Sequence, residues 1–337
     1  MTVKIGLIGF GNVGSSFLKL IQKKRDLLKK DFKMDVEVIA IFEYDGALID
    51  KSGINVDEVL AKKKEFRTLP IWQKGTTAKE LLSEIGINVC IETTPTNPKD
   101  GEPAYSHIIK AINHNIDVVA SNKGPFYLKC DEIKKLAKEK DVYVRYEATV
   151  ASCVPILACK ENIQGNTISG IRAILNGTCN YILSRMSSEG IPFSMALKEA
   201  QELGYAETDP TLDIEGYDAA GKLVILANEF YGWSRTIEDV KIRGITKITP
   251  QAIELAKSDG FTIKHLAIVE DDNLVVEPRL IERDSPLNIS GTLNVVELET
   301  KHAGPIILMG RGAGGYEAAS AILNDLIYIA QRRKNYQ

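Results

Sequence analysis

The densest group of chemically reactive side chains lies between Gly204 and Lys222, which reads GYAETDPTLDIEGYDAAGK. These nineteen residues include one lysine and five carboxylates, Glu207, Asp209, Asp213, Glu215 and Asp218. Three glycines and a proline interrupt the run, so it does not form one solvated face of a regular helix. A group of acids with one base, placed where a loop enters a helix, indicates a polar ligand site.

The helix that follows is predicted from about Gly216 to Tyr231 by its hydrophobic period. Its apolar face is wider than the usual stripe, so most of the helix should be buried. Asp218, Lys222 and Glu229 share one narrow polar line, which we expect to face a cleft. The alternative is a surface ion pair, because Asp218 and Lys222 are i,i+4 neighbours in the favourable order, a contact worth roughly 0.3 kcal/mol.

Length and composition limit the classes of protein that fit. A chain of 337 residues predicts two domains, and 44% hydrophobic with 26% charged residues is typical of a globular protein. The net charge of −3 supplies no basic field for nucleic acid. No apolar run is long enough for a membrane span and no signal peptide is recognised, so we expect a cytoplasmic protein without a nucleic-acid or membrane partner. The five cysteines form no CxxC pair and are expected to be free thiols, and the four scattered histidines argue against zinc.

Strands and helices alternate in the first part of the chain, which predicts an α/β fold with a Rossmann-type, doubly wound parallel sheet. Its expected strands are Val3–Ile8, Val36–Phe42, Val89–Glu92, Asp117–Ala120 and Val142–Tyr146. Later strands alternate polar and apolar residues and indicate an α+β domain, with strands at Ile168–Leu175, Thr262–Val269, Leu274–Ile281 and Val295–Glu299. We therefore expect a dinucleotide-binding domain formed by residues 1–150 and 306–337, and a substrate-binding and dimerisation domain formed by residues 151–305.

A GxGxxG motif follows the first strand and opens a helix, which is the context that dinucleotide binding requires. Its residues, the expected cofactor contacts, are Gly9, Phe10, Gly11, Asn12, Val13 and Gly14. Glu43 ends the next strand, where a carboxylate bonds a ribose 2′-hydroxyl and repels a 2′-phosphate. This favours NAD over NADP, although Asp45 offers the same chemistry and nearby lysines oppose it.

Two further strand ends carry polar residues. Ser121 and Lys123 follow one strand, and Thr93 and Thr94 follow the strand before it. Ligands bind at the carboxyl ends of parallel strands, so these residues are expected to contact the cofactor, with a solvated turn lysine as the alternative for Lys123. The Asn176–Asn180 segment opens a helix and offers amides and a hydroxyl to a polar substrate, or simply an N-cap.

Cys153, at the domain junction, suggests a second chemistry. It is similar to the cysteine of phosphorylating aldehyde dehydrogenases, which form a thioester before hydride transfer. Such a nucleophile needs a base or an electropositive setting, but no histidine is near in sequence and the following residues are apolar, which favours a packed, inert thiol at Cys153. We keep a phosphorylating semialdehyde dehydrogenase as the alternative function. A dinucleotide sensor with a degenerate site would not need Lys222.

Taken together, the motifs resemble homoserine dehydrogenase. The family signature is matched throughout by Ala200, Gly204-Tyr205-Ala206, Asp209-Pro210, Asp213-Ile214, Gly216, Asp218 and Lys222. The resemblance also covers Gly9–Gly14, Ser121–Lys123, Glu147–Val150, Asn176–Asn180 and the Gly310–Gly315 loop, so it spans nearly the whole chain. The length leaves no room for an aspartate kinase portion or an added regulatory domain.

This resemblance implies NAD(P)-dependent interconversion of L-homoserine and L-aspartate 4-semialdehyde, in threonine and methionine biosynthesis, by a homodimer. Lys222 is then the proton donor, Lys123 lies where cofactor and substrate meet, and Glu207 binds the substrate amino group. Asp213 and Asp218 position the substrate; further expected substrate contacts are Tyr205, Gly177 and Thr178, and further cofactor contacts are Gly204 and Gly312. Family members can also hold Na⁺ or K⁺, largely through carbonyls, at positions that match Glu147, Val150 and Ser152.

Overall fold

The computed structural model describes residues 1–333, which divide into two compact units. The first unit contains Met1–Cys153 and the chain from Gly314 onward, and the second contains Val154–Ala313. The second unit extends beyond the expected limit at residue 305, because strand β13 (Ile306–Arg311) pairs with β12 (Leu293–Thr300). Residues 334–337 of the segment expected in the first domain lie outside the described residues.

The sheet of the first unit confirms the predicted Rossmann-type architecture. Its strand order is β4-β3-β2-β1-β5-β6-β7, and the pairs from β2 through β7 are parallel. The strands are β1 (Thr2–Ile8), β2 (Asp35–Glu43), β3 (Gly46–Ile49), β4 (Trp72–Lys74), β5 (Val89–Glu92), β6 (Asp117–Ala120) and β7 (Val144–Arg145). The short antiparallel extension by β3 and β4 was not predicted from the sequence.

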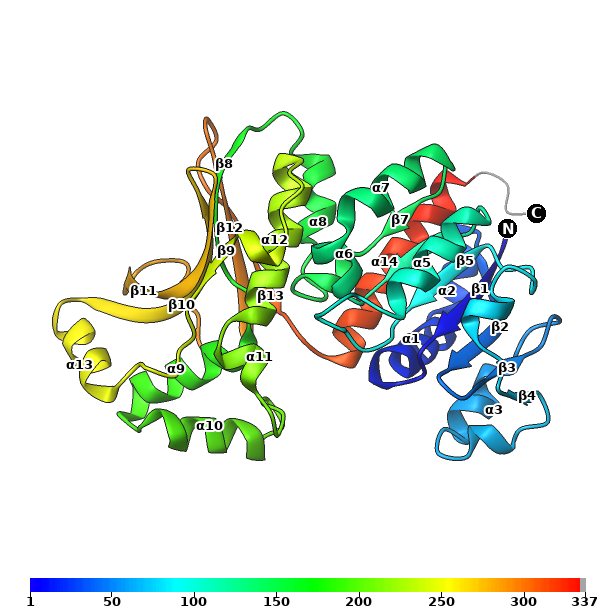
Figure 1. Cartoon of the computed structure of the whole chain (residues 1–337), viewed down its shortest axis with the longest axis horizontal. Helices are drawn as coiled ribbons and strands as arrows, with labels where there is room; N and C mark the ends of the chain where they lie inside the picture. Colours follow the sequence, from blue (N-terminus) through cyan, green and yellow to red (C-terminus); the bar gives the residue numbers. More distant parts are fainter. Residues whose placement is uncertain (334–337) are drawn as a thin grey trace. The chain divides into compact units, whose positions relative to one another are not determined.

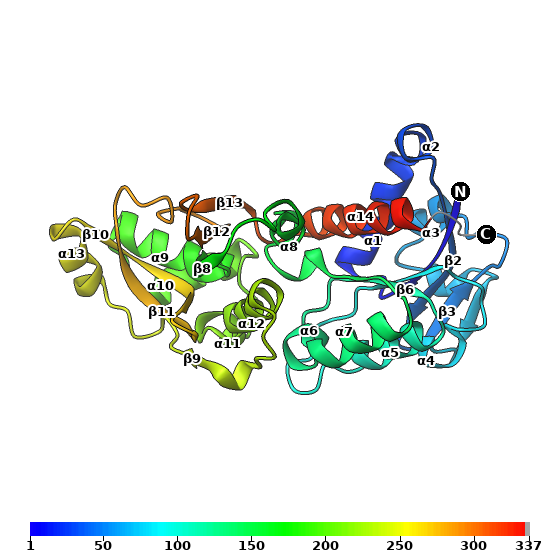
Figure 2. The same ribbon diagram turned by 90° about the horizontal axis from the view of Figure 1, so that it is seen from above.

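Helices cover both faces of this sheet, as Figures 1 and 2 show, with α1 and α14 on one face and α5 and α7 on the other. The helices are α1 (Asn12–Lys23), α2 (Arg25–Phe32), α3 (Val56–Ala61), α4 (Ala78–Leu81), α5 (Ala104–Asn113), α6 (Gly124–Leu128), α7 (Cys130–Glu139) and α14 (Gly315–Arg332), with 3₁₀ turns at Phe66–Thr68 and Glu147–Thr149. The core contains apolar residues of β1, β2, α1 and α14, and this double covering explains why the central strands read as continuous apolar runs.

The second unit contains a mixed sheet of order β13-β12-β8-β10-β11-β9, in which only β9 and β11 pair in parallel. The remaining strands are β8 (Ile168–Ile174), β9 (Val240–Ile242), β10 (Phe261–Glu270) and β11 (Asn273–Glu282). Its helices are α8 (Ile156–Cys159), α9 (Gly177–Glu189), α10 (Phe193–Glu202), α11 (Thr211–Ile214), α12 (Tyr217–Tyr231) and α13 (Pro250–Ser258), with 3₁₀ turns at Lys160–Asn162 and Ile237–Asp239. This confirms the predicted α+β character.

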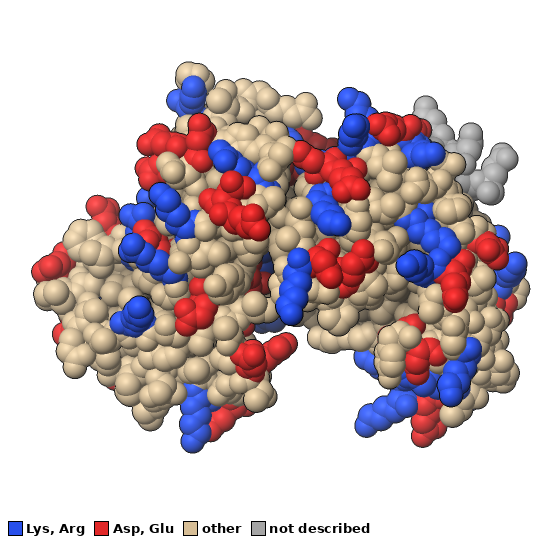
Figure 3. Space-filling model, viewed as in Figure 1, with Lys and Arg blue, Asp and Glu red and all other residues tan. Residues whose placement is uncertain are grey.

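None of the helices described in residues 1–333 has the length and apolar character needed to cross a membrane. On the face shown in Figure 3, basic and acidic side chains are interspersed, so this face presents no concentrated basic field.

Candidate active site

Lys222 is the one basic residue of α12, and it is only 8% exposed. Its Nζ donates to the Leu175 carbonyl at 2.7 Å and to Asp218 Oδ2 at 2.6 Å. The side chains of Lys222 and Asp218 are 10% and 14% exposed, so the alternative of a surface ion pair is wrong. A buried charge pair is stable only when hydrogen bonds satisfy both groups, and here they come from the segment between β8 and α9.

Asn176 organises the carboxylates around this lysine. It is the N-cap of α9, and its Oδ1 accepts from the Cys179 amide at 2.8 Å. Its Nδ2 donates to Asp213 Oδ1 at 2.7 Å and to Asp218 Oδ2 at 2.9 Å. The Asn176 side chain therefore acts both as a helix cap and as part of the polar site, the two alternatives given for this segment. Asn176 itself was not among the predicted site residues.

Asp213, near the end of α11, is held from its other side as well. The Thr178 hydroxyl lies 2.7 Å from the Tyr205 carbonyl and 3.2 Å from Asp213 Oδ2. Burial raises the pKa of the Asp213 carboxyl above its usual 3.8, and the charge of Asp218 adds to this effect. Hydrogen bonds from Asn176 and Thr178 oppose the shift, but the net effect is a raised pKa, so the ionised form of Asp213 is less stable in the folded protein than in water.

The other predicted residues of this segment lie at its surface. Glu207 is exposed in the loop after α10, and its carbonyl accepts from Gln201 Nε2 at 3.1 Å. Tyr205 is 46% exposed, with its ring 4.9 Å from that of Tyr181. Gly204 has a φ of 74°, a conformation in which a side chain is strained. Of these residues, Tyr205 is bonded toward the Asp213 site, through its carbonyl and the Thr178 hydroxyl.

Asp209, Glu215, Gly177 and Gly312 have contacts that stabilise the local fold. Asp209 Oδ1 accepts from the Thr211 amide at 3.1 Å and hydroxyl at 2.6 Å, and Glu215 Oε1 accepts from the Thr246 hydroxyl at 3.1 Å. A Cβ on Gly177 would lie 2.8 Å from the Thr292 carbonyl oxygen, and one on Gly312 would lie 1.9 Å from Asn294 Oδ1. Close packing within the second unit thus accounts for both glycines.

The dinucleotide loop of the first unit has the geometry that its glycines predict. Gly9 has a φ of 94°, and its amide donates to the Phe42 carbonyl at 2.8 Å. A Cβ on Gly14 would lie 2.1 Å from the Gly9 oxygen, whereas a Cβ on Gly11 would meet nothing within 4 Å. Gly9 and Gly14 are therefore needed to close the turn. Gly11 leaves open space immediately before α1, where a pyrophosphate binds a helix N-terminus in such folds.

Glu43 and its neighbours define the expected ribose side of this loop. Glu43 Oε1 accepts from the Phe10 amide at the end of β2. The other candidate carboxylate, Asp45, is bound by Arg67 at 2.7 and 2.9 Å. Lys63, which was not predicted as a site residue, reaches the loop from the end of α3 and donates to the Ser15 hydroxyl at 2.6 Å. Burial lowers the pKa of Lys63, with a further contribution from Lys19.

The strand ends of β5 and β6 are tied together by one asparagine. Asn122 Nδ2 donates to the carbonyls of Thr94 and Pro95, both at 3.0 Å. Glu92 is fully buried beneath them, bonding the Thr94 amide at 2.8 Å and His107 Nδ1 at 2.7 Å. The Thr93 hydroxyl donates to the Gly9 carbonyl at 2.8 Å, which joins this edge to the dinucleotide loop.

Ser121 and Lys123 flank Asn122 at the same edge of the sheet. Both are partly buried, and Lys123 is the N-cap residue of α6. The backbone amide of Lys123 donates to the Thr96 hydroxyl at 3.4 Å. The predicted convergence of these strand ends is therefore present within the first unit.

The residues expected at a cation site lie at the end of the first unit. Glu147 is 4% exposed, and its amide donates to Asp325 Oδ2 at 2.9 Å. Between Val150 and Cys153 the chain turns through Ala151 and Ser152, whose φ values are 53° and 49°. Residues 1–333 contain no group of three or more His, Cys, Asp or Glu side chains suited to a metal ion.

Comparison with known proteins places both halves of this arrangement in one family. The family model described as homoserine dehydrogenase matches residues 155–327, and the model of its NAD-binding domain matches residues 9–147. The chain belongs to the homoserine dehydrogenase family. Members are oxidoreductases that act on a CH–OH group with a nicotinamide dinucleotide, and the comparisons give no support to a phosphorylating dehydrogenase that uses Cys153.

Individual relatives agree over nearly their whole length. The homoserine dehydrogenase of Methanocaldococcus jannaschii is 45% identical over 332 residues, covering 97% of this chain and 98% of the relative. The NAD(+)-dependent homoserine dehydrogenase of Pseudomonas canavaninivorans is 34% identical, with 97% and 96% coverage. A solved structure of a hyperthermophilic archaeal homoserine dehydrogenase in complex with NADPH superposes with a TM-score of 0.87 at 29% identity, covering 100% of both chains.

The two loop glycines give a first prediction. Gly11→Ala adds a Cβ in open space and should leave the free energy of unfolding nearly unchanged, while raising the Kd for the dinucleotide at least about tenfold by blocking backbone approach. Gly14→Ala should lower the free energy of unfolding, because its Cβ meets the Gly9 oxygen. Denaturant unfolding and cofactor titration by fluorescence measure both. Equal destabilisation by the two substitutions would contradict this division of roles.

The electrostatics of Asp213 give a second prediction. Because its pKa is raised in the folded state, the unfolded chain loses this proton first as pH rises. The wild-type free energy of unfolding should therefore fall, relative to that of Asp213→Asn, as the pH rises above the unfolded-state pKa of about 3.9. Asp209→Asn is the control. Hydrogen bonds from Thr211 lower the pKa of Asp209, so the wild-type free energy of unfolding should rise with pH relative to that of Asp209→Asn. Parallel pH profiles for wild type and Asp213→Asn would show that Asp213 is not electrostatically strained.

Proposed function

We propose that the chain interconverts L-homoserine and L-aspartate 4-semialdehyde, with Lys222 as the group that exchanges a proton with the substrate oxygen. The observation that carries this proposal is the burial of Lys222 between Asp218 and the Leu175 carbonyl. Both acceptors stabilise the ammonium form, which is the form that can protonate a developing alkoxide. A nicotinamide cofactor supplies or accepts the hydride when it is bound.

The surrounding carboxylates suit the other end of the substrate. Glu207 is exposed and carries no ion pair among the described residues, so it is available to bind the substrate ammonium. Asp213 and Asp218 are fixed by Asn176 and position the substrate relative to Lys222. Tyr205, Gly177 and Thr178 complete the substrate side, and Gly204 and Gly312 are proposed to approach the cofactor.

On the cofactor side, we propose that Lys123 lies where cofactor and substrate meet, together with Ser121, Thr93 and Thr94. Phe10, Asn12 and Val13 contribute backbone from the glycine-rich loop. A monovalent cation, Na⁺ or K⁺, is proposed at Glu147, Val150 and Ser152, where two successive left-handed residues redirect the backbone carbonyls. The cation would then fix the chain at the end of the first unit.

We further propose a cytoplasmic homodimer. The open sheet of the second unit supports dimerisation, because large apolar side chains on its strands are exposed: Leu280 on β11 by 59%, and Ile307 and Met309 on β13 by 38% and 57%. Such exposed apolar surface is typical of a protein–protein interface.

Replacing Lys222 tests the catalytic proposal. Lys222→Ala should lower kcat for homoserine oxidation by at least about a hundredfold, because the group that exchanges a proton with the substrate oxygen is lost, while the KM for the dinucleotide changes little. Lys198→Ala on the exposed side of α10 is the matched control and should keep full activity. Formation of reduced nicotinamide, followed by its absorbance, measures both. Full turnover by Lys222→Ala would remove Lys222 from the chemistry, and a wild-type protein inactive with homoserine and either dinucleotide would overturn the function.

Cofactor preference gives a separate prediction. We propose that NAD is used in preference to NADP, because Glu43 carries no ion pair among residues 1–333 and would repel a 2′-phosphate. Glu43→Gln should reduce the ratio of kcat/KM for NAD to that for NADP by at least about tenfold. Glu37→Gln, on the same strand β2, should leave the ratio unchanged. A wild-type preference for NADP would show that Lys63 and Arg67 outweigh Glu43.

A further inference from the structure

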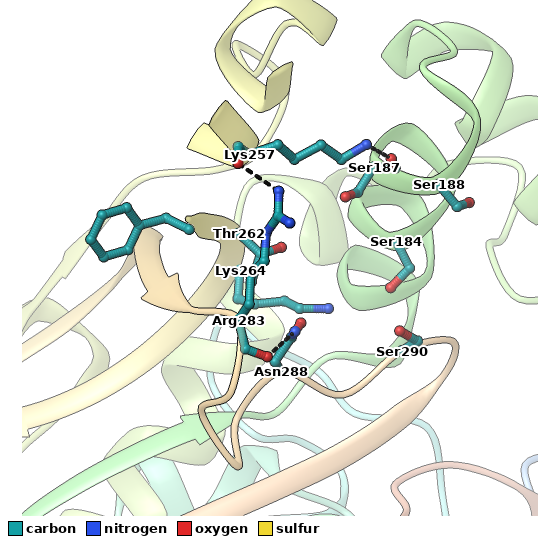
Figure 4. A pocket seen from close by; sticks show the side chains of 10 residues that line it. Ser184, Ser187, Ser188, Lys257, Thr262, Lys264, Arg283, Asn288 and Ser290 are labelled. Carbon is teal, nitrogen blue, oxygen red and sulfur yellow. Dashed lines mark hydrogen bonds between the residues drawn. The ribbon is translucent and has the colours of Figure 1, made fainter. Parts of the chain in front are cut away.

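The second unit contains a pocket that the proposed reaction does not use (Figure 4). It has a volume of about 450 Å³ and lies between the last turns of α9 and α13, the start of β10 and the loop that joins β11 to β12. This volume suits a small metabolite. Its walls carry three cationic side chains, Lys257, Lys264 and Arg283, and no acidic one.

None of these three cations has a carboxylate partner among residues 1–333. Lys257 donates to the Ser187 carbonyl, and Arg283 Nη2 donates to the Lys257 carbonyl at 2.5 Å. Lys264 donates to the Ile289 carbonyl and to Asn180 Oδ1 at 3.2 Å. Three positive charges thus share one pocket with only neutral acceptors, which leaves the pocket strongly attractive to an anion.

Capping of helix C-termini explains two of these contacts but not the third. Lys257 and Arg283 bond carbonyls in the last turns of α9 and α13, where a cation is favourable. Lys264 is 3% exposed and lies on the same face of β10 as the buried Leu266 and Ile268. An apolar residue at this position would avoid the desolvation of an ammonium, which lowers the pKa of Lys264 to about 8. A ligand that uses the charge accounts for a lysine at this position.

The remaining lining groups define the chemistry of that ligand. The hydroxyls of Ser187, Thr262 and Ser290 line the pocket and have no hydrogen-bond partner among the described residues. Three cations and three hydroxyls are more donors than the two oxygens of a carboxylate accept, but they match the oxygens of a phosphate group. We propose that this pocket binds the phosphate group of a small phosphorylated metabolite.

The pocket is one helical turn from the candidate active site of the same unit. Asn180, which contacts Lys264, lies one turn after Asn176, and its amide donates to the Asn176 carbonyl at 3.2 Å. Asn176 is the residue that holds Asp213 and Asp218. A phosphate on Lys264 would therefore bind beside the helix that positions the catalytic carboxylates.

Calorimetric titration with inorganic phosphate tests the proposal, with the full chain saturated with NAD so that the dinucleotide loop is filled. Wild type should bind phosphate, and the double substitution Lys257→Ala, Arg283→Ala should weaken binding at least about tenfold. Lys264→Met, which removes the charge and keeps an unbranched side chain one atom shorter, should weaken it similarly. Lys241→Ala, an exposed lysine on β9 outside the pocket, should leave the Kd unchanged.

Phosphate binding that survives all the pocket substitutions, or no binding to wild type, would overturn the site. Citrate that binds more tightly than phosphate at this pocket would overturn the assignment to a phosphate group. Far-ultraviolet circular dichroism and the NAD titration show whether each variant is folded. Because binding heat is measured without turnover, this test does not depend on whether the chain oxidises homoserine.

Discussion

Burying an ammonium group in an apolar helix is the constraint on which the candidate active site depends. A lysine at position 222 of α12 loses its hydration, and this loss is offset only if acceptors are fixed in place before substrate arrives. Asp218 supplies one acceptor from the same helix, and the Leu175 carbonyl supplies the other. Asn176 then fixes Asp218 and Asp213 together, so the end of β8, the start of α9 and the α11–α12 junction must converge. The sheet and helices of the second unit thus bring these segments together around the Lys222 ammonium, which is buried and held in one orientation.

The first unit is shaped by a different constraint, because a charged ligand must be able to approach its backbone. Gly9 and Gly14 close the turn after β1, and Gly11 leaves space in front of α1. Thr93 and Asn122 tie the ends of β5 and β6 to that turn through hydrogen bonds to carbonyls, so the cofactor edge is a single bonded network. Glu92 and His107 support this network from below, as a buried pair that the motif analysis did not identify.

The features that could be predicted from the sequence are those with a local signal in it. The apolar runs of β1, β5 and β6 and the GxGxxG turn identify the parallel sheet, and the spacing of Asp218 and Lys222 places both on one face of α12. The missed features depend on tertiary contacts. β4 has only three residues, with two exposed, and so shows no period, and β13 was assigned to the wrong unit because its glycine-rich end resembles a loop. Asn176 looked like an ordinary cap, since its second role depends on carboxylates far along the chain. The contact of Lys63 with Ser15 and the proposed phosphate pocket were also missed, because each joins residues that lie far apart in the sequence.

The central claim is that Lys222 exchanges the proton with the substrate oxygen. A crystal structure of the enzyme with homoserine and an oxidised nicotinamide dinucleotide tests this claim most directly, through the distance from Lys222 Nζ to the substrate hydroxyl oxygen. We expect a hydrogen-bond distance, roughly 2.6–3.2 Å, with the substrate ammonium near Glu207. A hydroxyl bound to Lys123, with no hydrogen bond between Lys222 and the substrate, would contradict it.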